Sequence, residues 1–584
     1  MKAIDCCLHV LPLIVICCAE SHTKPPLKTG DHRPDGGGKQ VGGRAWDAEL
    51  EPSCDLDPVS KNQGRKPACP RSLFRKTCYV MKIRSRIKAY SRNTPRIGNQ
   101  TTRTLAIFLL IVATQLSPLA SSHAAGAERQ LRPNIIFIMA DDMGYADVGA
   151  FGSEMINTPN IDQLARQGTL YTQFYAGASV CAPSREVLMT GLHTGHTVFR
   201  SNTPKVGGKT EAFGEGTRRI SLTGEETTIA AVLKEAGYTT GITGKWGIAE
   251  PNSEATPMKM GFDEWLGYLN QNHANYYYPD YLWRNNARMA IPENTHAYSY
   301  DILADLAPDF VLDLVDEYWA APRTEDKRIY SNDLMRDFAL DFIRDNHASP
   351  FFLYFAATIP HKLMEVPSLG EYSEKDWPRD AKNYAAMVSR LDGYVGEIVE
   401  ELDRLGIAEN TLIIFTSDNG PVENEVSTFF HSAGRLRGTK GTLYEGGLKV
   451  PMIIKWPNAV PAGAVSNVPW MFVDVFPSLV EMAGAAYSGQ LDGLSLLPTI
   501  LGQDQDLSDR FLYWEFPRKR LWQAGRLGKW KGVREGTDQP LELYNLEKDP
   551  NETTNVADSH PGIVKEIEKR LSEEHVPSPY WPQN

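Results

Sequence analysis

The stretch Asn134-Ile-Ile-Phe-Ile-Met139, which runs into Ala140-Asp141-Asp142, indicates how this chain folds. Its apolar residues follow one another without alternation, as in a strand that is buried on both faces of a sheet. Segments with helical patterns separate it from similar apolar runs. The alternation predicts an α/β fold, in which a large, mostly parallel mixed sheet is flanked by helices. Further strands are expected at residues 238–243, 351–357 and 411–416, and helices at 160–166, 225–235 and 383–405.

The pattern changes after residue 504. Short apolar segments separated by turn residues predict antiparallel strands at 510–516, 527–534 and 541–546, and an amphipathic helix is expected at 562–574. We therefore expect a catalytic domain over residues 131–504 and a small C-terminal α+β subdomain, made of an antiparallel sheet and a helix, over residues 505–584.

The N-terminal region has the composition of a targeting segment. Residues 81–103 begin with Met and carry only basic charges, an apolar run starts at Leu105, and small residues continue to Ala127. This layout predicts a signal peptide over residues 81–127 and a secreted or periplasmic protein. The apolar run is too short for stable membrane insertion, although retention of residues 105–120 as an anchor is an alternative. Residues 1–80 are expected to be a disordered extension, or to precede a true start at Met81.

The charge of the chain argues against a nucleic-acid partner. The net charge is −11, and no long basic stripe follows residue 130. Nucleic-acid binding depends on clustered lysine and arginine residues. We therefore expect no nucleic-acid partner.

Polar clusters follow the ends of several predicted strands. Asp141-Asp142, Lys245, His361 and Asp418-Asn419 each come after such a strand. Ligand sites of open α/β sheets lie at the carboxyl ends of the strands, so these side chains should meet. An all-oxygen set suits Ca²⁺, or Mg²⁺, and not zinc. Each acidic pair could instead form a turn or a helix cap, but two pairs at one sheet edge favour the metal site.

Cys181 is the only cysteine after residue 127, so it cannot form a disulfide within that region. It begins the segment Cys181-Ala-Pro-Ser-Arg-Glu-Val-Leu-Met-Thr-Gly191, whose pattern predicts a helix N-terminus there. An unmodified thiol at this position could be a nucleophile or an inert buried group. Arg185 follows one turn later and could compensate anionic charge. Lys245 and Lys440 are candidate anion clamps, and His361 is a candidate general acid, although solvated lysines and structural histidines are common.

These segments together resemble the formylglycine-dependent, arylsulfatase-like sulfatases of the alkaline phosphatase superfamily. The resemblance runs from about Arg132 to the C-terminus and includes the order and spacing of the motifs. Its specific pieces are residues 133–145 and 158–165, the segment that begins at Cys181, Gly244-Lys-Trp246, Pro360-His361, Ser417-Asp-Asn-Gly420, Leu436-Arg-Gly-Thr-Lys440 and Tyr444-Glu-Gly-Gly447.

The resemblance implies a mechanism. Cys181 is oxidised by a maturation enzyme to formylglycine, whose hydrate attacks the sulfur of a sulfate ester. A Ca²⁺ ion is held by residue 181 and by Asp141, Asp142, Asp418 and Asn419. Arg185, Lys245 and Lys440 bind the ester and stabilise charge, while His361 and Lys440 assist the leaving oxygen.

One position departs from the family pattern. The family often has a histidine two residues after the lysine of Gly244-Lys245, and this histidine is assigned to deprotonating the second-step intermediate. This chain has Gly247 there. His273, which is also expected to bind substrate, is one candidate to replace it, and His193 and His196 are the others.

The expected activity is hydrolysis of sulfate esters. A sulfated carbohydrate is the favoured substrate, because the loops over residues 251–300 are rich in aromatic side chains that suit a sugar ring. The alternatives are a phosphonate or phosphate monoester hydrolase of the same superfamily and a non-catalytic protein that binds sulfated glycans. The aromatic residues concerned are Tyr276, Tyr277, Tyr278, Tyr281 and Trp283.

Overall fold

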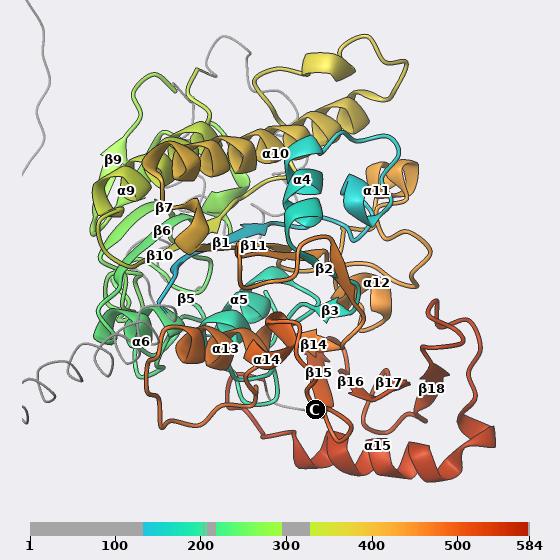
Figure 1. The fold of residues 1–584 in the computed structure, drawn as a ribbon. Helices are drawn as coiled ribbons and strands as arrows, with labels where there is room; N and C mark the ends of the chain where they lie inside the picture. Colours follow the sequence, from blue (N-terminus) through green and yellow to red (C-terminus); the bar gives the residue numbers. More distant parts are fainter. Residues whose placement is uncertain (1–131, 203–204, 207–217, 295–327, 582–584) are drawn as a thin grey trace, which may run out of the picture. The chain divides into compact units, whose positions relative to one another are not determined.

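The computed structural model describes residues 132–202, 205–206, 218–294 and 328–581. β1 (Asn134–Ala140) lies in the middle of a ten-stranded sheet (Figure 1), and all seven of its residues are buried. It pairs in parallel with β11 (Thr411–Ser417) on one side and with β10 (Phe351–Ala356) on the other. β6 (Thr239–Lys245) pairs in parallel with β10. Four parallel strands therefore end at one edge of the sheet, as the sequence predicted.

The outer strands make the sheet mixed. β7 (Glu264–Tyr268) pairs in parallel with β6, β8 (Tyr281–Arg284) pairs antiparallel with β7, and β9 (Ala287–Ala290) pairs antiparallel with β8. Beyond β11 lie β12 (Met452–Lys455), β2 (Thr169–Tyr171) and β13 (Ala464–Ser466). The expected large, mostly parallel mixed sheet is confirmed.

Helices cover both faces of this sheet. Ile136 and Ile138 of β1 face the apolar layer beneath α4 (Pro159–Gln167), α9 (Ser331–Asn346) and α10 (Arg379–Leu405). Ile135 and Phe137 face the opposite layer, which holds α5 (Cys181–Thr190), α6 (Ile229–Glu235) and α13 (Val475–Met482). Figure 1 shows these two groups of helices above and below the sheet. Short helices α11 (Glu425–Phe430), α12 (Glu445–Leu448) and α14 (Leu497–Ile500) complete the layers.

Two helix starts differ from the sequence prediction by four residues. α6 begins at Ile229 and not at residue 225, because the Thr228 side chain accepts a hydrogen bond from the Ala231 N–H and caps the helix. α10 begins at Arg379, four residues before the expected start, directly after Pro378. No helix among the described residues has the length and apolar character needed to cross a bilayer.

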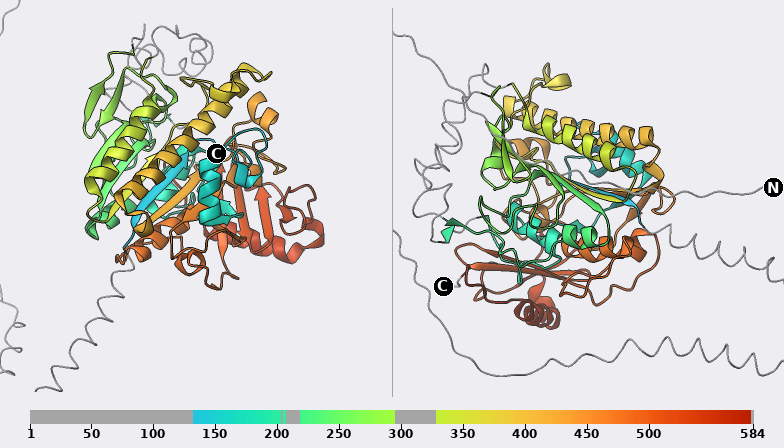
Figure 2. Two further views of the ribbon diagram at one scale, coloured as in Figure 1. Left: turned by 45° about the horizontal axis from the view of Figure 1, so that its top comes forward. Right: turned by 90° about the vertical axis from the view of Figure 1, so that its left-hand side faces the viewer.

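The C-terminal region forms a separate antiparallel sheet. Its strands are β15 (Phe511–Pro517), β16 (Leu521–Leu527), β17 (Trp530–Arg534) and β18 (Glu542–Asn545). α15 (Pro561–Glu573) packs on this sheet through Ile567 and Leu571 and is the dark red helix in Figure 2. The sequence prediction missed β16 and began the strand after it three residues too early, because Gly528 and Lys529 form the turn between the two strands.

Buried polar contacts join this sheet to the rest of the fold. The Trp514 Nε1–H donates to the Ala176 carbonyl at 2.9 Å. Lys531 is fully buried and lies 2.9 Å from a carboxylate oxygen of Glu445, at the start of α12. Breaking a buried ion pair is costly, so this contact fixes α12 and the loop before it, which carries Lys440.

Candidate active site

The predicted polar residues meet at the carboxyl ends of the central strands. Asp141 and Asp142 follow β1, Asp418 and Asn419 follow β11, and Lys245 is the last residue of β6. The other members of the cluster are Cys181, Arg185, His361 and Lys440. All of them are buried except Lys440, which is partly buried.

Cys181 is the first residue of α5, as the sequence indicated. Its Sγ lies 3.3 Å from Asp141 Oδ1, 3.7 Å from Asp142 Oδ1 and 3.1 Å from Lys440 Nζ. The Ser184 hydroxyl donates to the Asp418 carbonyl oxygen at 2.6 Å. This contact ties the first turn of α5 to the end of β11 and so places Cys181 beside the carboxylates.

Three cations balance three carboxylates in the cluster. Lys245 Nζ lies 2.6 Å from Asp141 Oδ2, and Lys440 Nζ lies 2.5 and 2.8 Å from the two oxygens of Asp142. Arg185 Nη2 lies 2.8 Å from Asp418 Oδ2. Buried charges are stable only when they are paired, and this pairing satisfies that condition.

The electrostatics follow from burial and from this pairing. Burial by itself would raise the pKa of Asp141, but the positive charges of Lys245, His361, Arg185 and Lys440 outweigh it and hold the pKa below its ordinary value. Burial, reinforced by the charges of Asp141 and Asp418, raises the pKa of the Cys181 thiol to about 12. The thiol is therefore protonated at neutral pH and is a poor nucleophile in its unmodified form.

His361 contacts the cluster through one ring nitrogen. Its Nε2 lies 3.4 Å from Asp142 Oδ2, and its Nδ1 lies 3.2 Å from the Lys362 carbonyl oxygen. Burial lowers the pKa of His361 to about 4, against the opposing effect of Asp142 and Asp141. The ring is then neutral at pH 7, with its proton on Nδ1 donated to the carbonyl. Nε2 is an acceptor in this state, and the general-acid role of His361 stays a prediction.

Tyr277 supports the His361 segment, and sequence reasoning assigned it a different role. Its hydroxyl donates to the carbonyl oxygens of His361, at 2.7 Å, and Thr358, at 3.1 Å. Tyr276, Tyr278 and Tyr281 are also buried, each less than one tenth exposed, and Trp283 stacks on Trp265. Trp283 is partly buried, and the role of these aromatic residues in a sugar pocket stays a prediction. Residues 295–300 of the expected sugar-binding loops lie outside the described residues.

His273 is enclosed by aromatic rings. Its ring centroid lies 4.9 Å from that of Tyr268 and 4.4 Å from that of Tyr281. Burial lowers the pKa of His273 to about 3, and the charge of Arg288 contributes to this. The hydrogen-bond partners of the Cys181 Sγ in the described structure are two aspartates and one lysine, and a histidine is not among them. The role of His273 in substrate binding stays a prediction.

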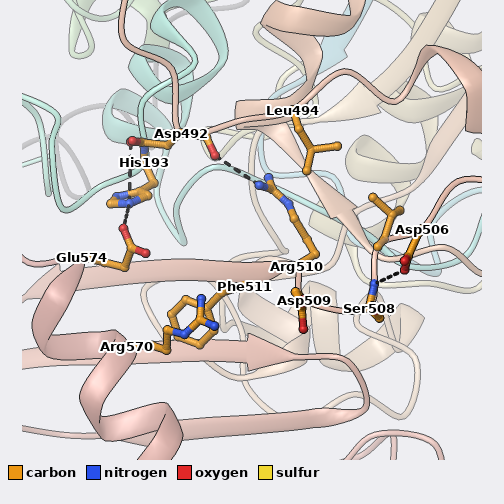
Figure 3. A pocket seen from close by; sticks show the side chains of 11 residues that line it. His193, Asp492, Leu494, Asp506, Ser508, Asp509, Arg510, Phe511, Arg570 and Glu574 are labelled. Carbon is orange, nitrogen blue, oxygen red and sulfur yellow. Dashed lines mark hydrogen bonds and ion pairs between the residues drawn. The ribbon is translucent and has the colours of Figure 1, made fainter.

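His193 and His196 belong to another cluster, near the C-terminal sheet. His193 Nε2 lies 3.1 Å from Glu574 Oε2, and His196 Nδ1 lies 2.8 Å from Asp492 Oδ2. The two imidazole rings stack, with centroids 4.3 Å apart. Figure 3 shows His193, Asp492 and Glu574 at the wall of a cavity of about 400 Å³, whose lining contains none of the residues that surround Cys181. The hypothesis that one of these histidines replaces the base lost at Gly247 gains no support from this placement.

We expect this histidine cluster to make stability depend on pH. The hydrogen bond with Asp492 raises the pKa of His196, so the folded state holds the proton more tightly than the unfolded chain. The His196–Asp492 pair therefore contributes its full stabilisation below about pH 6.5. This stabilisation is lost as pH rises through the raised pKa of His196. Asp492→Asn should cost about 1–3 kcal/mol at low pH, and less at high pH. Melting temperatures of both proteins from about pH 5.5 to about pH 8.5 measure this difference.

Asp509→Asn is the matched control, because Asp509 is an exposed aspartate at the wall of the same cavity. It should leave the pH dependence unchanged. An Asp492→Asn protein whose melting temperature differs from that of the wild type by the same amount at every pH would contradict the assignment.

Comparison with known proteins gives matches over the same region. A family model described as sulfatase matches residues 133–485, which include every residue of the cluster around Cys181, and a model described as N-sulphoglucosamine sulphohydrolase, C-terminal, matches residues 439–576. N-acetylgalactosamine-6-sulfatase of Canis lupus familiaris is 32% identical over 419 residues, or 70% of this chain and 73% of that protein. Arylsulfatase A of Homo sapiens is 31% identical over 483 residues, or 77% of this chain and 88% of that protein.

Solved structures show the same similarity. The crystal structure of Ps i-CgsB in complex with k-i-k-neocarrahexaose has 30% sequence identity and a TM-score of 0.61, and the match covers 76% of this chain and 92% of that one. A structure from a study of glycosaminoglycan metabolism by Bacteroides thetaiotaomicron has 26% identity and a TM-score of 0.60, with 76% and 99% coverage.

Proposed function

The chain belongs to the sulfatase family and hydrolyses sulfate esters, and from this premise we propose that it acts on a sulfated carbohydrate with formylglycine at residue 181 and a bound Ca²⁺. The observation that carries the proposal is the gathering of Cys181, three carboxylates and three cations at one sheet edge. The names of relatives support the substrate class, since they include N-acetylgalactosamine-6-sulfatase and a complex with k-i-k-neocarrahexaose.

The residues of the cluster fit a Ca²⁺ ion, with Mg²⁺ as the alternative. Asp141, Asp142 and Asp418 offer carboxylate oxygens, which hard divalent cations prefer. Asn419 Oδ1 is buried and accepts no hydrogen bond from the described residues, while its Nδ2 donates to Asp142 Oδ1 at 2.8 Å. A buried carbonyl oxygen without a donor is costly, and a metal ligand role explains it. When bound, the ion would act as a template and Lewis acid for the sulfate group.

Cys181 is proposed as the precursor of the nucleophile. Its thiol cannot serve in that role at neutral pH because burial keeps it protonated. Oxidation to formylglycine would replace the thiol by an aldehyde, whose hydrate supplies an attacking hydroxyl group. The carboxylate of Asp141 is the nearest acceptor for a proton at this position, since its Oδ1 is 3.3 Å from Sγ.

The cations are proposed to hold the ester and to compensate its charge. Lys245 pairs with Asp141 and Lys440 pairs with Asp142, and Arg185 lies one helical turn after Cys181. Preorganised positive groups in a buried site stabilise charge that develops on a leaving oxygen. The resemblance to sulfatases assigns Lys440 and His361 to the leaving oxygen, and both lie in the cluster, with Lys440 Nζ 3.1 Å from Sγ and His361 Nε2 3.4 Å from Asp142 Oδ2.

We also propose that the protein is secreted or periplasmic and that a maturation enzyme oxidises Cys181. The signal-peptide pattern at residues 81–127 supports export. That segment and the extension over residues 1–80 lie outside the described residues. The domain boundary at residues 504/505 stays a prediction, although the C-terminal sheet begins close to it, at Phe511.

We expect the oxidation of Cys181 to precede folding. The side chain is fully buried, so an enzyme cannot reach it in the native protein. Purified folded protein that still carries cysteine should gain no aldehyde on incubation with the maturation enzyme, whereas the unfolded chain should. The measurement is peptide mass spectrometry, because the aldehyde is about 18 Da lighter than the thiol. Equal conversion of folded and unfolded chains would contradict the prediction.

The central test is a comparison of substrates. Protein that is made with a maturation enzyme and supplied with Ca²⁺ should release sulfate from sulfated saccharides faster than it cleaves an aryl phosphate or an aryl phosphonate. A preference for a phosphonate would favour the second hydrolase class. Tight binding of sulfated glycans without turnover, with Cys181 unmodified, would favour the non-catalytic alternative.

A further inference from the structure

Gly247 brings a second loop next to the cations of the site. It lies two residues after Lys245 with a positive φ of 78°, and its N–H donates to the Leu269 carbonyl at 3.1 Å. A Cβ atom at this position would lie 3.3 Å from Gln271 Oε1, 3.3 Å from Arg185 Cδ and 3.5 Å from Lys245 Cε. The Gln271 amide, which follows β7, is therefore close to the side chains of two residues that are proposed to hold the sulfate.

The amide oxygen of Gln271 is buried and has no hydrogen-bond donor among the described residues. An unsatisfied buried acceptor is costly, so the group needs an explanation. Lys245 Nζ is in the converse situation. It carries three N–H donors and is fully buried, and within the described part of the chain it donates a hydrogen bond to Asp141. A lysine with further donors and an amide oxygen without a donor thus both lie around the point that a Cβ atom of Gly247 would occupy.

These two groups differ in what they can bind. A sulfate group offers only acceptors, so Lys245 attracts it and a carbonyl oxygen repels it. A carbonyl oxygen instead binds a hydroxyl or an N–H group. A lysine next to a free carbonyl oxygen therefore suits a sulfate ester that carries a hydrogen-bond donor close to the sulfate group, as a sugar does. It does not suit a simple aryl sulfate, which has no such donor.

We propose that Gln271 is a specificity-determining residue, whose Oε1 accepts a hydrogen bond from a hydroxyl group of the sugar ring that bears the sulfate. The proposal rests on the proposed function and extends it, because it names the feature of the substrate that is recognised beside the sulfate. Sites that are built to bind a substrate hydroxyl discriminate strongly against analogues without it, since the protein group is then left unpaired.

Gln271→Met tests this, because methionine has a similar length and replaces the amide oxygen by a thioether sulfur, which is only a weak acceptor. The substrates are 4-nitrophenyl sulfate and a set of galactose and N-acetylhexosamine sulfates. We expect kcat/KM to fall by about 10- to 100-fold on the sugar sulfate that the wild type prefers and to change by less than about twofold on 4-nitrophenyl sulfate. Gln163→Met is the matched control, because Gln163 is exposed on α4, and it should alter neither rate.

Monodeoxy analogues of the preferred sugar sulfate give a second measurement, whose first part uses the wild-type protein and does not depend on a stable variant. One analogue should show the same loss with the wild type, and Gln271→Met should add no further loss on it. An equal loss on both substrate classes would overturn the proposal, because Gln271 would then act on the shared machinery. Unchanged rates would overturn it as well.

The proposed function can fail separately. Wild-type activity on 4-nitrophenyl sulfate alone would leave the sulfatase activity standing and overturn both the proposed carbohydrate substrate and the sugar contact, whereas wild-type activity on sugar sulfates that Gln271→Met does not alter would overturn the sugar contact alone. No activity on any sulfate ester, with the aldehyde present, would overturn the proposed function and this inference together.

Discussion

Cys181→Ala should reduce kcat on every sulfate ester by about 10⁴-fold or more, since removal of a nucleophile leaves only the contribution of binding and of the remaining charges. In this cluster the loss of activity should be close to complete. The contacts of Sγ with Asp141, Asp142 and Lys440 place residue 181 at the centre of the charged groups, and alanine supplies no oxygen nucleophile there. The measurement is the initial rate of sulfate release, together with the mass of the peptide that contains residue 181.

The fold itself should tolerate this substitution. Sγ makes no disulfide, and the substitution removes a single buried atom, which costs about 1 kcal/mol in typical cases. The melting temperature should therefore stay within a few degrees of that of the wild type. A variant that keeps a tenth of the wild-type rate would show that residue 181 is not the nucleophile, and the mechanism proposed for the other residues would then have to be abandoned.

The sequence predicted which residues meet at the ends of the central strands, and the reason is physical. The apolar run at β1 can be satisfied only by burial on both faces, so its end must be the end of a central strand. Asp141 and Asp142 follow that end directly, and Asp418 and Asn419 follow β11 in the same way. Parallel pairing then brings the four residues together whatever the details of packing. Their meeting could thus be predicted from local patterns alone.

The partners of the remaining histidines could not be predicted in this way. His193 and His196 follow the helix that carries Cys181, which made them candidates for the site. The chain after α5 instead leads them to Asp492 and Glu574, about 300 and 380 residues away along the sequence. Tyr277 was similarly assigned to a sugar pocket and proves to hold the His361 segment. Contacts of this kind depend on how loops that are far apart in the sequence pack together. Neither the hydrophobic periodicity nor the residue types predict that packing.

Removal of Ca²⁺ should have the second largest effect. We expect chelation to lower kcat by about 10³-fold, because Lewis-acid stabilisation of a transferring group contributes several kcal/mol, and added Ca²⁺ should restore the rate. Ca²⁺ should also raise the melting temperature, since an ion at 100 times its Kd stabilises the fold by about 2.7 kcal/mol. Without the ion, Lys245 and Lys440 compensate the aspartates, so the protein should stay folded. Loss of activity on chelation can therefore be distinguished from unfolding of the protein.

Asp142→Asn should weaken both responses to Ca²⁺, because it removes one anionic ligand and keeps the size of the side chain. Asp147→Asn is the matched control. Asp147 is a fully buried aspartate five residues further on, but its Oδ2 accepts hydrogen bonds from the Gly144 N–H and the Tyr384 hydroxyl and has no part in the cluster. Its variant can lose stability and should keep the full Ca²⁺-dependent gain in rate and in melting temperature. If both variants respond to Ca²⁺ as the wild type does, the ion is not bound where the orphaned Asn419 oxygen and the three carboxylates indicate.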